Sequence, residues 1–291
     1  MTKKTWKEKA ARLIFRSASS TAILIVALIF LFLFKEAIPF LKSPGISELF
    51  GKVWKPVSFQ KELYGLLPLI SGSFLVTILA TVIAIPFGVC GAIYISEIAT
   101  GLERETFKPF IELLAGIPSV VIGFFGLVVL APFIKSVFGL GSGLTALTGS
   151  LLLALMAIPT IISISEDAIN SVPRTYKEAS YALGATKLQT IWKVTVPASI
   201  SGITAAVMLG MGRVIGETMT VLMVTGNAGI ITLNPFESVR TMTATIAAEM
   251  GEVPFGSEHY SALFWVGIVL LLITFGLNLI AIKVFRKYGS R

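Results

Sequence analysis

The sequence predicts an all-α integral membrane protein with six transmembrane helices. Hydrophobic residues make up 55% of the 291 residues and charged residues only 14%, whereas a soluble domain has about 25% charged residues. The mean hydropathy is +0.86. Six apolar runs are each long enough for a helix that crosses a bilayer. They are predicted to be helices because a backbone in lipid must satisfy its own hydrogen bonds, and scattered runs of this length do not suit a β-barrel.

The predicted spans follow one another along the chain. The first is Ser17–Phe34. The uncharged run from Leu63 to Ser96 is too long for one straight crossing, so a lead-in segment around 64–68 is expected before a helix that begins near Ser73. The remaining spans are predicted at 113–134, 144–165, 194–226 and 260–282.

The positions of the basic residues predict the orientation. With the N-terminus inside, the inner segments hold 16 Lys and Arg residues and the outer loops hold seven. Cytoplasmic loops are enriched in these residues, so both termini of this multi-pass protein of the cell membrane are expected in the cytoplasm. Residues 1–16 would be a cytoplasmic segment, and 17–291 one permease domain in contact with membrane lipid. This distribution also explains most of the net charge of +8 without nucleic acid as a partner.

Several kinds of chemistry are excluded by composition. The single cysteine, Cys90, allows no disulfide within the chain and no cysteine zinc site. The single histidine, His259, follows Glu258 in a polar outer loop and is expected to be solvated, so no metal site and no bound cofactor are expected. The chain lacks a Gly-x-x-x-x-Gly-Lys-Ser/Thr loop and cannot hydrolyse ATP alone. A membrane enzyme is disfavoured because the spans hold no recognisable catalytic pairing.

The inner loop 166–199 is predicted to form a compact helix-turn-helix. Pro173 suits the first turn of a helix, with Ser171 as its cap, and Gly184 ends or bends this helix. A second amphipathic segment begins at Lys187 and is expected to stop before Pro197, because the residue ahead of a proline avoids the α region. Two rigid helices could transmit a force. An amphipathic hairpin at the membrane interface is the alternative.

A second constellation lies inside the fifth predicted span. Arg213 and Glu217 are four residues apart, so they are expected on one face of a helix. An ionised group in a membrane is costly, about 2.5 to 3.5 kcal/mol for an arginine at the centre of a helix, and usually faces protein or a water-filled path. The guanidinium fork fits a tetrahedral oxyanion, which predicts a transport role. The alternative is an ion pair that only fixes helix register.

The inner loop resembles the segment by which ABC importer permeases contact their ATPase. Its pattern is Glu-Ala-small, three residues, Gly, nine residues, a β-branched residue, one residue, and an aliphatic residue with Pro, although the third position is Ser180 instead of alanine. The matching residues are Glu178, Ala179, Ser180, Gly184, Ala185, Val194, Val196 and Pro197. Further runs resemble the phosphate-specific transport permeases of the PstC type: 64–73, 92–97, 116–121, 212–218 and 240–246.

This resemblance implies a type I ABC importer permease fold and a set of partners. The chain would pair with a sister permease of the PstA type, rest on an ATPase dimer of the PstB type that holds ATP and Mg²⁺, and receive phosphate from an extracytoplasmic binding protein of the PstS type. Arg213 and Glu217 match residues important for transport in the family. The expected ATPase-coupling residues are Arg174, Glu178, Ala179, Gly184, Ala185 and Pro197.

Two alternatives for the function stay open. The permease could carry another tetrahedral oxyanion, such as sulfate or molybdate. A secondary transporter, in which an ion gradient drives flux and Arg213 and Glu217 form a proton-linked pair, is a rival from another class. Such a carrier would not need the inner helix-turn-helix. The outer loop 227–258, with an expected helix at 244–250, could dock a soluble partner or partly re-enter the membrane.

Overall fold

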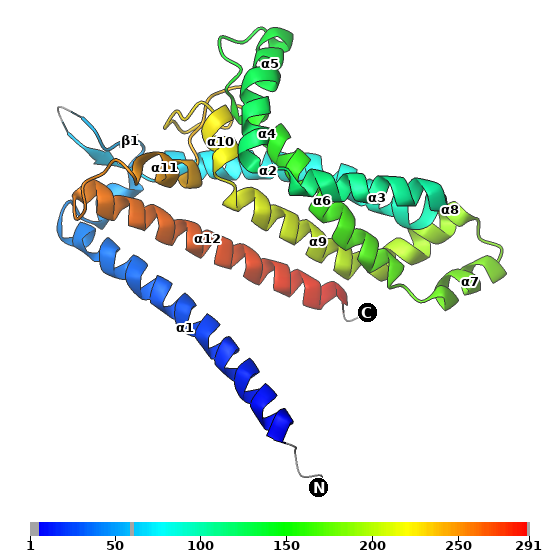
Figure 1. The fold of residues 1–291 in the computed structure, drawn as a ribbon. Coiled ribbons are helices and arrows are strands. Elements are labelled where there is room, and N and C mark those ends of the chain that lie inside the picture. Colours follow the sequence, from blue (N-terminus) through cyan, green and yellow to red (C-terminus); the bar gives the residue numbers. More distant parts are fainter. Residues whose placement is uncertain (1–5, 59–60, 290–291) are drawn as a thin grey trace.

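The computed structural model of this chain describes residues 6–58 and 61–289, and its architecture is helical (Figure 1). The helices are α1 (Trp6–Lys42), α2 (Leu67–Ile93), α3 (Gly101–Gly116), α4 (Ser119–Phe125), α5 (Ala131–Phe138), α6 (Ala146–Asn170), α7 (Arg174–Ala182), α8 (Lys187–Thr190), α9 (Val196–Gly216), α10 (Met219–Val224), α11 (Met242–Glu249) and α12 (Glu258–Gly289). A 3-10 helix, η1 (Ile46–Phe50), and three π-helical turns, η2 (Tyr94–Ile98), η3 (Gly126–Leu130) and η4 (Ile191–Thr195), complete the helical part.

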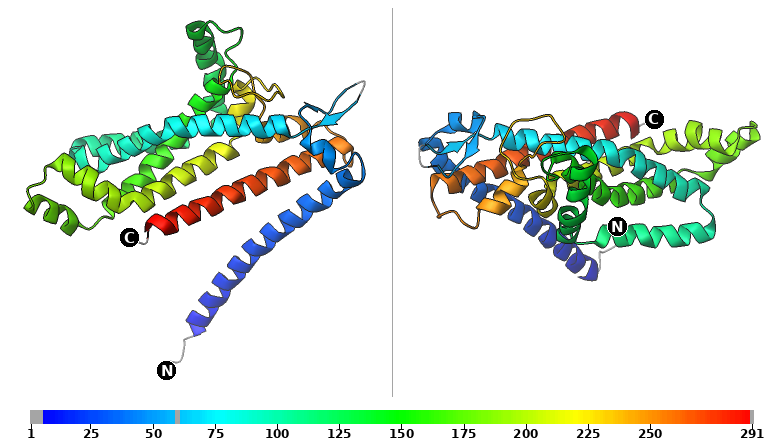
Figure 2. Two further views of the ribbon diagram at one scale, coloured as in Figure 1. Left: turned by 180° about the vertical axis from the view of Figure 1, so that it is seen from behind. Right: turned by 90° about the horizontal axis from the view of Figure 1, so that it is seen from above.

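Within the described residues, six helices are long and apolar enough to cross a membrane, which confirms the predicted class. Their bounds are Ala10–Lys42, Leu67–Ile98, Ser119–Phe138, Ala146–Asn170, Lys187–Gly216 and Glu258–Ile280. We call the end of the bundle that carries the short strands and α11 the outer end, and the end that carries α7 and α8 the inner end (Figures 1 and 2). Which end faces the cytoplasm stays a prediction from the charge distribution.

The centre of the bundle consists of α2, α6 and α9, which pack through small residues. Ala80 and Ala84 on α2 and Ala157 on α6 are fully or almost fully buried. A Cβ atom at Gly88 of α2 or at Gly210 of α9 would lie within 3 Å of the Ile161 side chain of α6. Small residues at these crossings therefore allow the helix backbones to approach closely, as in other membrane bundles.

Helix α1 leaves this bundle towards its N-terminus (Figures 1 and 2). It packs against α12 at the outer end, where the indole nitrogen of Trp265 donates to the carbonyl oxygen of Ala37 at 2.9 Å. The most apolar stretch of α1 is otherwise uncovered within this chain. An apolar helix surface of this kind is suited to lipid or to another membrane subunit.

The second apolar run begins with a strand instead of a simple lead-in. Strand β2 (Leu63–Tyr64) pairs antiparallel with β1 (Trp54–Lys55), with Trp54 opposite Tyr64. Helix α2 then begins at Leu67, so the predicted start near Ser73 is wrong. Pro68 does not delay the helix because a proline in the first turn loses no intrahelical hydrogen bond.

The third predicted span is also wrong in its boundaries. Residues 113–116 belong to α3, which starts from a capping box at Thr100 and runs back from the inner end. The backbone is extended at Ile117 and Pro118, and a continuous helix then occupies Ser119–Phe138. Pro118 separates the two segments because its ring and missing N–H oppose a continuous helix.

The fifth predicted span is shifted towards the N-terminus. One helical segment runs from Lys187 to Gly216, so the prediction that the second helix of the inner loop stops before Pro197 is wrong. The π-helical turn η4 lies just before Pro197, and the Val196 N–H donates to the carbonyl oxygen of Ile191. Such a turn re-pairs the backbone around a proline inside a helix. Helix α9 then ends at Gly216, ahead of α10.

Candidate functional site

The Arg213 side chain lies in the last turn of α9 and is exposed in this chain. Its Nη2 atom donates to the carbonyl oxygen of Ala115 at 3.4 Å. Ala115 is next to the last residue of α3, so the guanidinium lies beside the free carbonyl groups of a helix C-terminus, where a cation is favoured. Helices α3 and α9 thus meet at the ends where both are interrupted.

Glu217 does not share the helix face of Arg213, contrary to the prediction. Its backbone is extended (φ −69°, ψ 134°) because α9 has already ended. One oxygen of the Glu217 carboxylate accepts from the Thr220 N–H at 3.3 Å, and the backbone carbonyl oxygen of Glu217 accepts from the Thr243 hydroxyl at 2.8 Å. No ion pair joins Arg213 and Glu217 in the described part of the chain. An ion pair that fixes register is therefore not present here.

The two helix interruptions lie side by side. The Thr220 hydroxyl donates to the carbonyl oxygen of Ser119 at 3.1 Å. A Cβ atom added to Gly123 would lie 3.2 Å from the Thr220 Cα, so α4 and α10 are in backbone contact. Interrupted helices at membrane depth leave polar backbone groups that must face protein or a water-filled cavity. Together with the exposed charge of Arg213, they mark this face as a candidate translocation path.

The inner end carries the predicted helix-turn-helix, formed by α7 and α8. Helix α7 ends in a Schellman motif: the Ala185 N–H donates to the Ser180 carbonyl and the Gly184 N–H to the Tyr181 carbonyl. Gly184 has φ +82°, which confirms that it terminates the helix. The expected cap does not form, since the Ser171 hydroxyl donates to the carbonyl oxygen of Ala168 at the end of α6.

A buried hydrogen bond joins the two helices of this hairpin. The Ser180 and Thr190 hydroxyl oxygens lie 2.9 Å apart, and both residues are buried. The serine that departs from the alanine of the family pattern thus has a local partner. A second capping box, between Thr186 and Gln189, starts α8. The hairpin is therefore a defined rigid unit.

The hairpin also presents a surface that nothing in this chain covers. Of the predicted coupling residues, Arg174, Glu178, Ala179, Gly184 and Pro197 are exposed and Ala185 is partly buried. Leu183 is 90% exposed, and other large apolar side chains on the hairpin are exposed as well: Tyr176, Tyr181, Leu188 and Trp192. Exposed apolar groups at a polar end of a membrane protein are typical of a protein interface.

Ion pairs hold the inner end to the bundle. Lys177 of α7 pairs closely with Glu97 in η2. Glu166 of α6 is 2% exposed and pairs with Arg104 at 2.7 Å and with Lys108 at 3.3 Å, both on α3. Glu97, Arg104 and Lys108 therefore form ion pairs between helical segments. The Lys177–Glu97 pair links the hairpin to the π-helical turn that directly follows α2.

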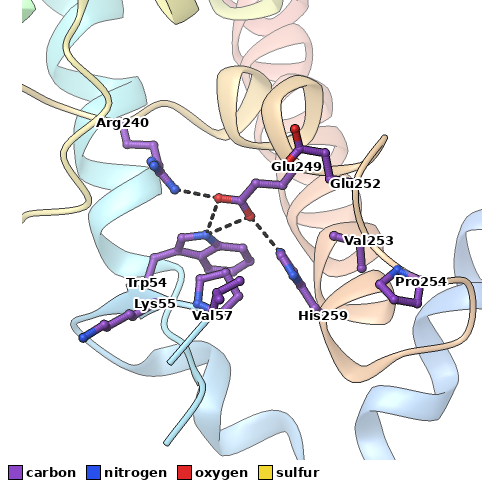
Figure 3. A pocket seen from close by; sticks show the side chains of 10 residues that line it. Trp54, Lys55, Val57, Arg240, Glu249, Glu252, Val253, Pro254 and His259 are labelled. Carbon is purple, nitrogen blue, oxygen red and sulfur yellow. Dashed lines mark hydrogen bonds and ion pairs between the residues drawn. The ribbon is translucent and has the colours of Figure 1, made fainter. Parts of the chain in front are cut away.

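At the outer end, Trp54 and three residues between positions 240 and 259 form a network that the sequence did not predict (Figure 3). The Glu249 carboxylate accepts from Trp54 Nε1 at 3.1 Å, Arg240 Nη1 at 2.6 Å and His259 Nε2 at 2.8 Å. His259, whose side chain is 12% exposed, is not the solvated histidine that was expected. Beside it, burial and then the contact with Glu62 raise the pKa of Tyr64 above its ordinary value.

Six spans, a polar face at two interrupted helices and an exposed hairpin at the inner end are the architecture of a membrane permease. The chain belongs to the family of binding-protein-dependent transport system inner membrane components, whose sequence profile matches residues 88–287.

Individual relatives agree with this assignment. The chain is 47% identical over 222 residues to the probable ABC transporter permease protein YqgH of Bacillus subtilis strain 168. The aligned region covers 76% of this chain and 72% of that protein. The chain is also 34% identical over 295 residues to the phosphate transport system permease protein PstC of Mesorhizobium japonicum, which covers 95% of this chain and 89% of the relative. The predicted resemblance to the PstC type is thereby confirmed.

Solved structures show the same fold. A chain of a bacterial alginate ABC transporter superposes with a TM-score of 0.67 at 15% identity, over 98% of each chain. A chain of the MetNI methionine ABC transporter in an inward-facing conformation gives a TM-score of 0.58 at 19% identity, over 77% of this chain and 94% of that one. The type I ABC importer permease fold is confirmed. By its family, this chain is a transport component.

Proposed function

We propose that this chain is the permease subunit of an ATP-driven importer of inorganic phosphate. The observation that carries the proposal is the similarity to PstC over 95% of the chain, joined to the uncompensated guanidinium of Arg213 at the helix interruptions. A guanidinium offers forked donors that match two oxygens of a tetrahedral anion.

Phosphate would pass along the face where α3–α4 and α9–α10 are interrupted. Arg213 is not paired with a carboxylate in the described part of the chain and donates only one long hydrogen bond, so its other N–H groups are available for an anion. A single weakly held cation suits a transient contact, because a site that binds tightly would slow release. Glu217 borders this face and, through Thr220, fixes the start of α10.

The uncovered surfaces support the proposal of three kinds of partner. A sister permease of the PstA type would cover the translocation face, and an ATPase dimer of the PstB type, with its ATP and Mg²⁺, would bind the α7–α8 hairpin at Arg174, Glu178, Ala179, Gly184, Ala185 and Pro197. A phosphate-binding protein of the PstS type would dock at the outer end. Closure of the ATPase would push the rigid hairpin, and the two permeases would rock between inward-facing and outward-facing states with both termini in the cytoplasm.

Uptake of labelled phosphate by the reconstituted complex tests this function. We expect phosphate uptake that requires ATP, the binding protein and Arg213. Uptake that persists without ATP but collapses with the ion gradient would support a secondary transporter instead. Inhibition by excess sulfate or molybdate would still indicate an ATP-driven importer, but one that transports a different anion.

A further inference from the structure

The network around Glu249 connects the β1–β2 strand pair, which we call the outer hairpin, to α11, the helix that covers the translocation face. Glu249 is the last residue of α11, Trp54 lies on β1, and His259 lies in the first turn of α12. Figure 3 shows the three donors converging on one carboxylate. An ionised carboxylate only accepts hydrogen bonds, so His259 Nε2 carries the proton in this contact.

The opposite end of α11 closes on the helix interruptions. The Thr243 hydroxyl donates to the carbonyl oxygen of Glu217 at 2.8 Å, and the Met242 N–H donates to the Ser73 hydroxyl of α2 at 2.9 Å. A Cβ atom at Gly72 would lie 2.3 Å from the carbonyl oxygen of Arg240, so the chain entering α11 lies directly on α2. Residues 241–245 are all buried. Helix α11 thus covers the outer side of the candidate path.

The network is also reachable from outside the chain. A cavity of about 420 Å³ lies against Glu249 and is lined by Trp54, Lys55, Arg240, Glu252 and His259, among others. On the hairpin side, Val57 also lines this cavity and is 80% exposed. A protein that contacts the outer β1–β2 hairpin would therefore act on Trp54, which itself lines this cavity.

We propose that Glu249 is a positioning residue that latches α11 shut over the translocation face, and that movement of the β1–β2 hairpin, transmitted through Trp54, releases it. Three donors hold one partly buried carboxylate, and hydrogen bonds to a charged group are stronger than neutral ones. Loss of the Glu249 charge frees the C-terminal end of α11. The helix is then held at its N-terminal end by the Thr243 and Met242 contacts alone. The inference rests on the proposed permease function for its role in transport.

Thiol labelling of α11 tests the latch without any cargo. Thr245 is 1% exposed, and within the described residues its hydroxyl donates only to the Thr241 carbonyl of its own helix. A Thr245→Cys reporter in a Cys90→Ser background is placed in the full complex in nanodiscs and exposed to a membrane-impermeant maleimide. We expect slow labelling in the otherwise native chain and labelling at least about tenfold faster with Glu249→Gln, because labelling follows the open population.

Glu252→Gln is the matched control. Glu252 lines the same cavity, and its carboxylate has no hydrogen bond or ion pair recorded in the described residues, so its loss removes the same charge without touching the latch. Trp54→Phe keeps an aromatic ring, removes the indole donor and leaves some volume unfilled at this buried position; it should also accelerate labelling, and it tests the latch if Glu249→Gln fails to assemble. Labelling of Glu249→Gln no faster than that of Glu252→Gln would overturn the latch. Acceleration by Glu249→Gln with none by Trp54→Phe would overturn the link to the hairpin. Neither result depends on which anion is transported.

Discussion

The guanidinium of Arg213 reaches the carbonyl oxygen of Ala115 across the ends of two interrupted helices, α9 and α3. This contact places Arg213, which has no ion pair within the described residues, at the point where α3 and α9 both end. A cation there is stabilised by the α3 C-terminus and still has free donors. The geometry therefore supports a transport role over a purely structural one.

Replacement of Arg213 should cripple uptake without preventing assembly. Arg213→Ala should lower phosphate uptake by about tenfold or more, because charge-assisted hydrogen bonds to the anion are lost. Arg213→Lys should restore it only partly, since an ammonium lacks the planar fork. Arg12→Ala, in the exposed part of α1, is the control and should transport normally. Normal uptake by Arg213→Ala would remove this residue from the path.

A bulky residue at position 184 should uncouple ATP hydrolysis from transport. Gly184 has φ +82°, and a Cβ atom there meets nothing within 4 Å in this chain, so the penalty is conformational. Gly184→Val should distort the end of α7, because a β-branched residue rarely adopts positive φ, whereas Gly184→Asn should keep most of the coupling. The ratio of ATP hydrolysed to phosphate imported measures this. Equal ratios for the two variants would refute the helix-turn-helix geometry.

The Ser180–Thr190 hydrogen bond should show thermodynamic coupling. Ser180→Ala or Thr190→Val alone leaves a buried hydroxyl without its partner, at a cost of about 1 to 2 kcal/mol. The double variant should be little worse than either single one, a departure from additivity that thermal unfolding of the purified complex can measure. Strictly additive losses of stability would show that the two hydroxyls do not interact.

Proline positions illustrate what the sequence could and could not predict. The number and approximate place of the spans followed from hydropathy alone, and Gly184 followed from local turn chemistry. The effects of three prolines were harder to predict, because the same residue type acts differently at each position. Pro68 lies in the first turn of a helix, Pro118 separates two helices, and Pro197 lies inside a helical segment after a π-helical turn. Which of these happens depends on the packing of neighbouring helices, which a local pattern does not contain.

The sequence nominated Arg213 and Glu217 for the candidate site, and their role stays a prediction, but it did not predict their arrangement. Spacing by four implied one face for Arg213 and Glu217, but the helix ends at Gly216. The Glu249 network joins Trp54 to a residue 195 positions away, so no local pattern indicated it. A weak signal was available, since Glu249 and His259 are both polar residues next to expected helix ends.

The start of α3 should loosen in acid. The main-chain N–H of Thr100 and then its hydroxyl hold the pKa of Glu103 below its ordinary value. A carboxyl whose pKa is lowered on folding stabilises the structure above its unfolded pKa, and that contribution is lost as the pH falls through the folded pKa. Hydrogen exchange of the Thr100 amide should therefore rise in acid relative to Glu103→Gln, in which the side-chain amide can still accept the bond. Identical pH profiles for the two chains would contradict this.

Phosphate uptake by the complete complex, challenged with excess sulfate and excess molybdate, tests the central claim most directly. The native chain and Arg213→Ala are compared in the same proteoliposomes, with ATP inside and the binding protein outside. We predict uptake by the native chain that ignores both competitors and is lost in the variant. Uptake that sulfate or molybdate suppresses, or that continues unchanged without Arg213, would contradict the account of this chain as a phosphate permease that uses Arg213.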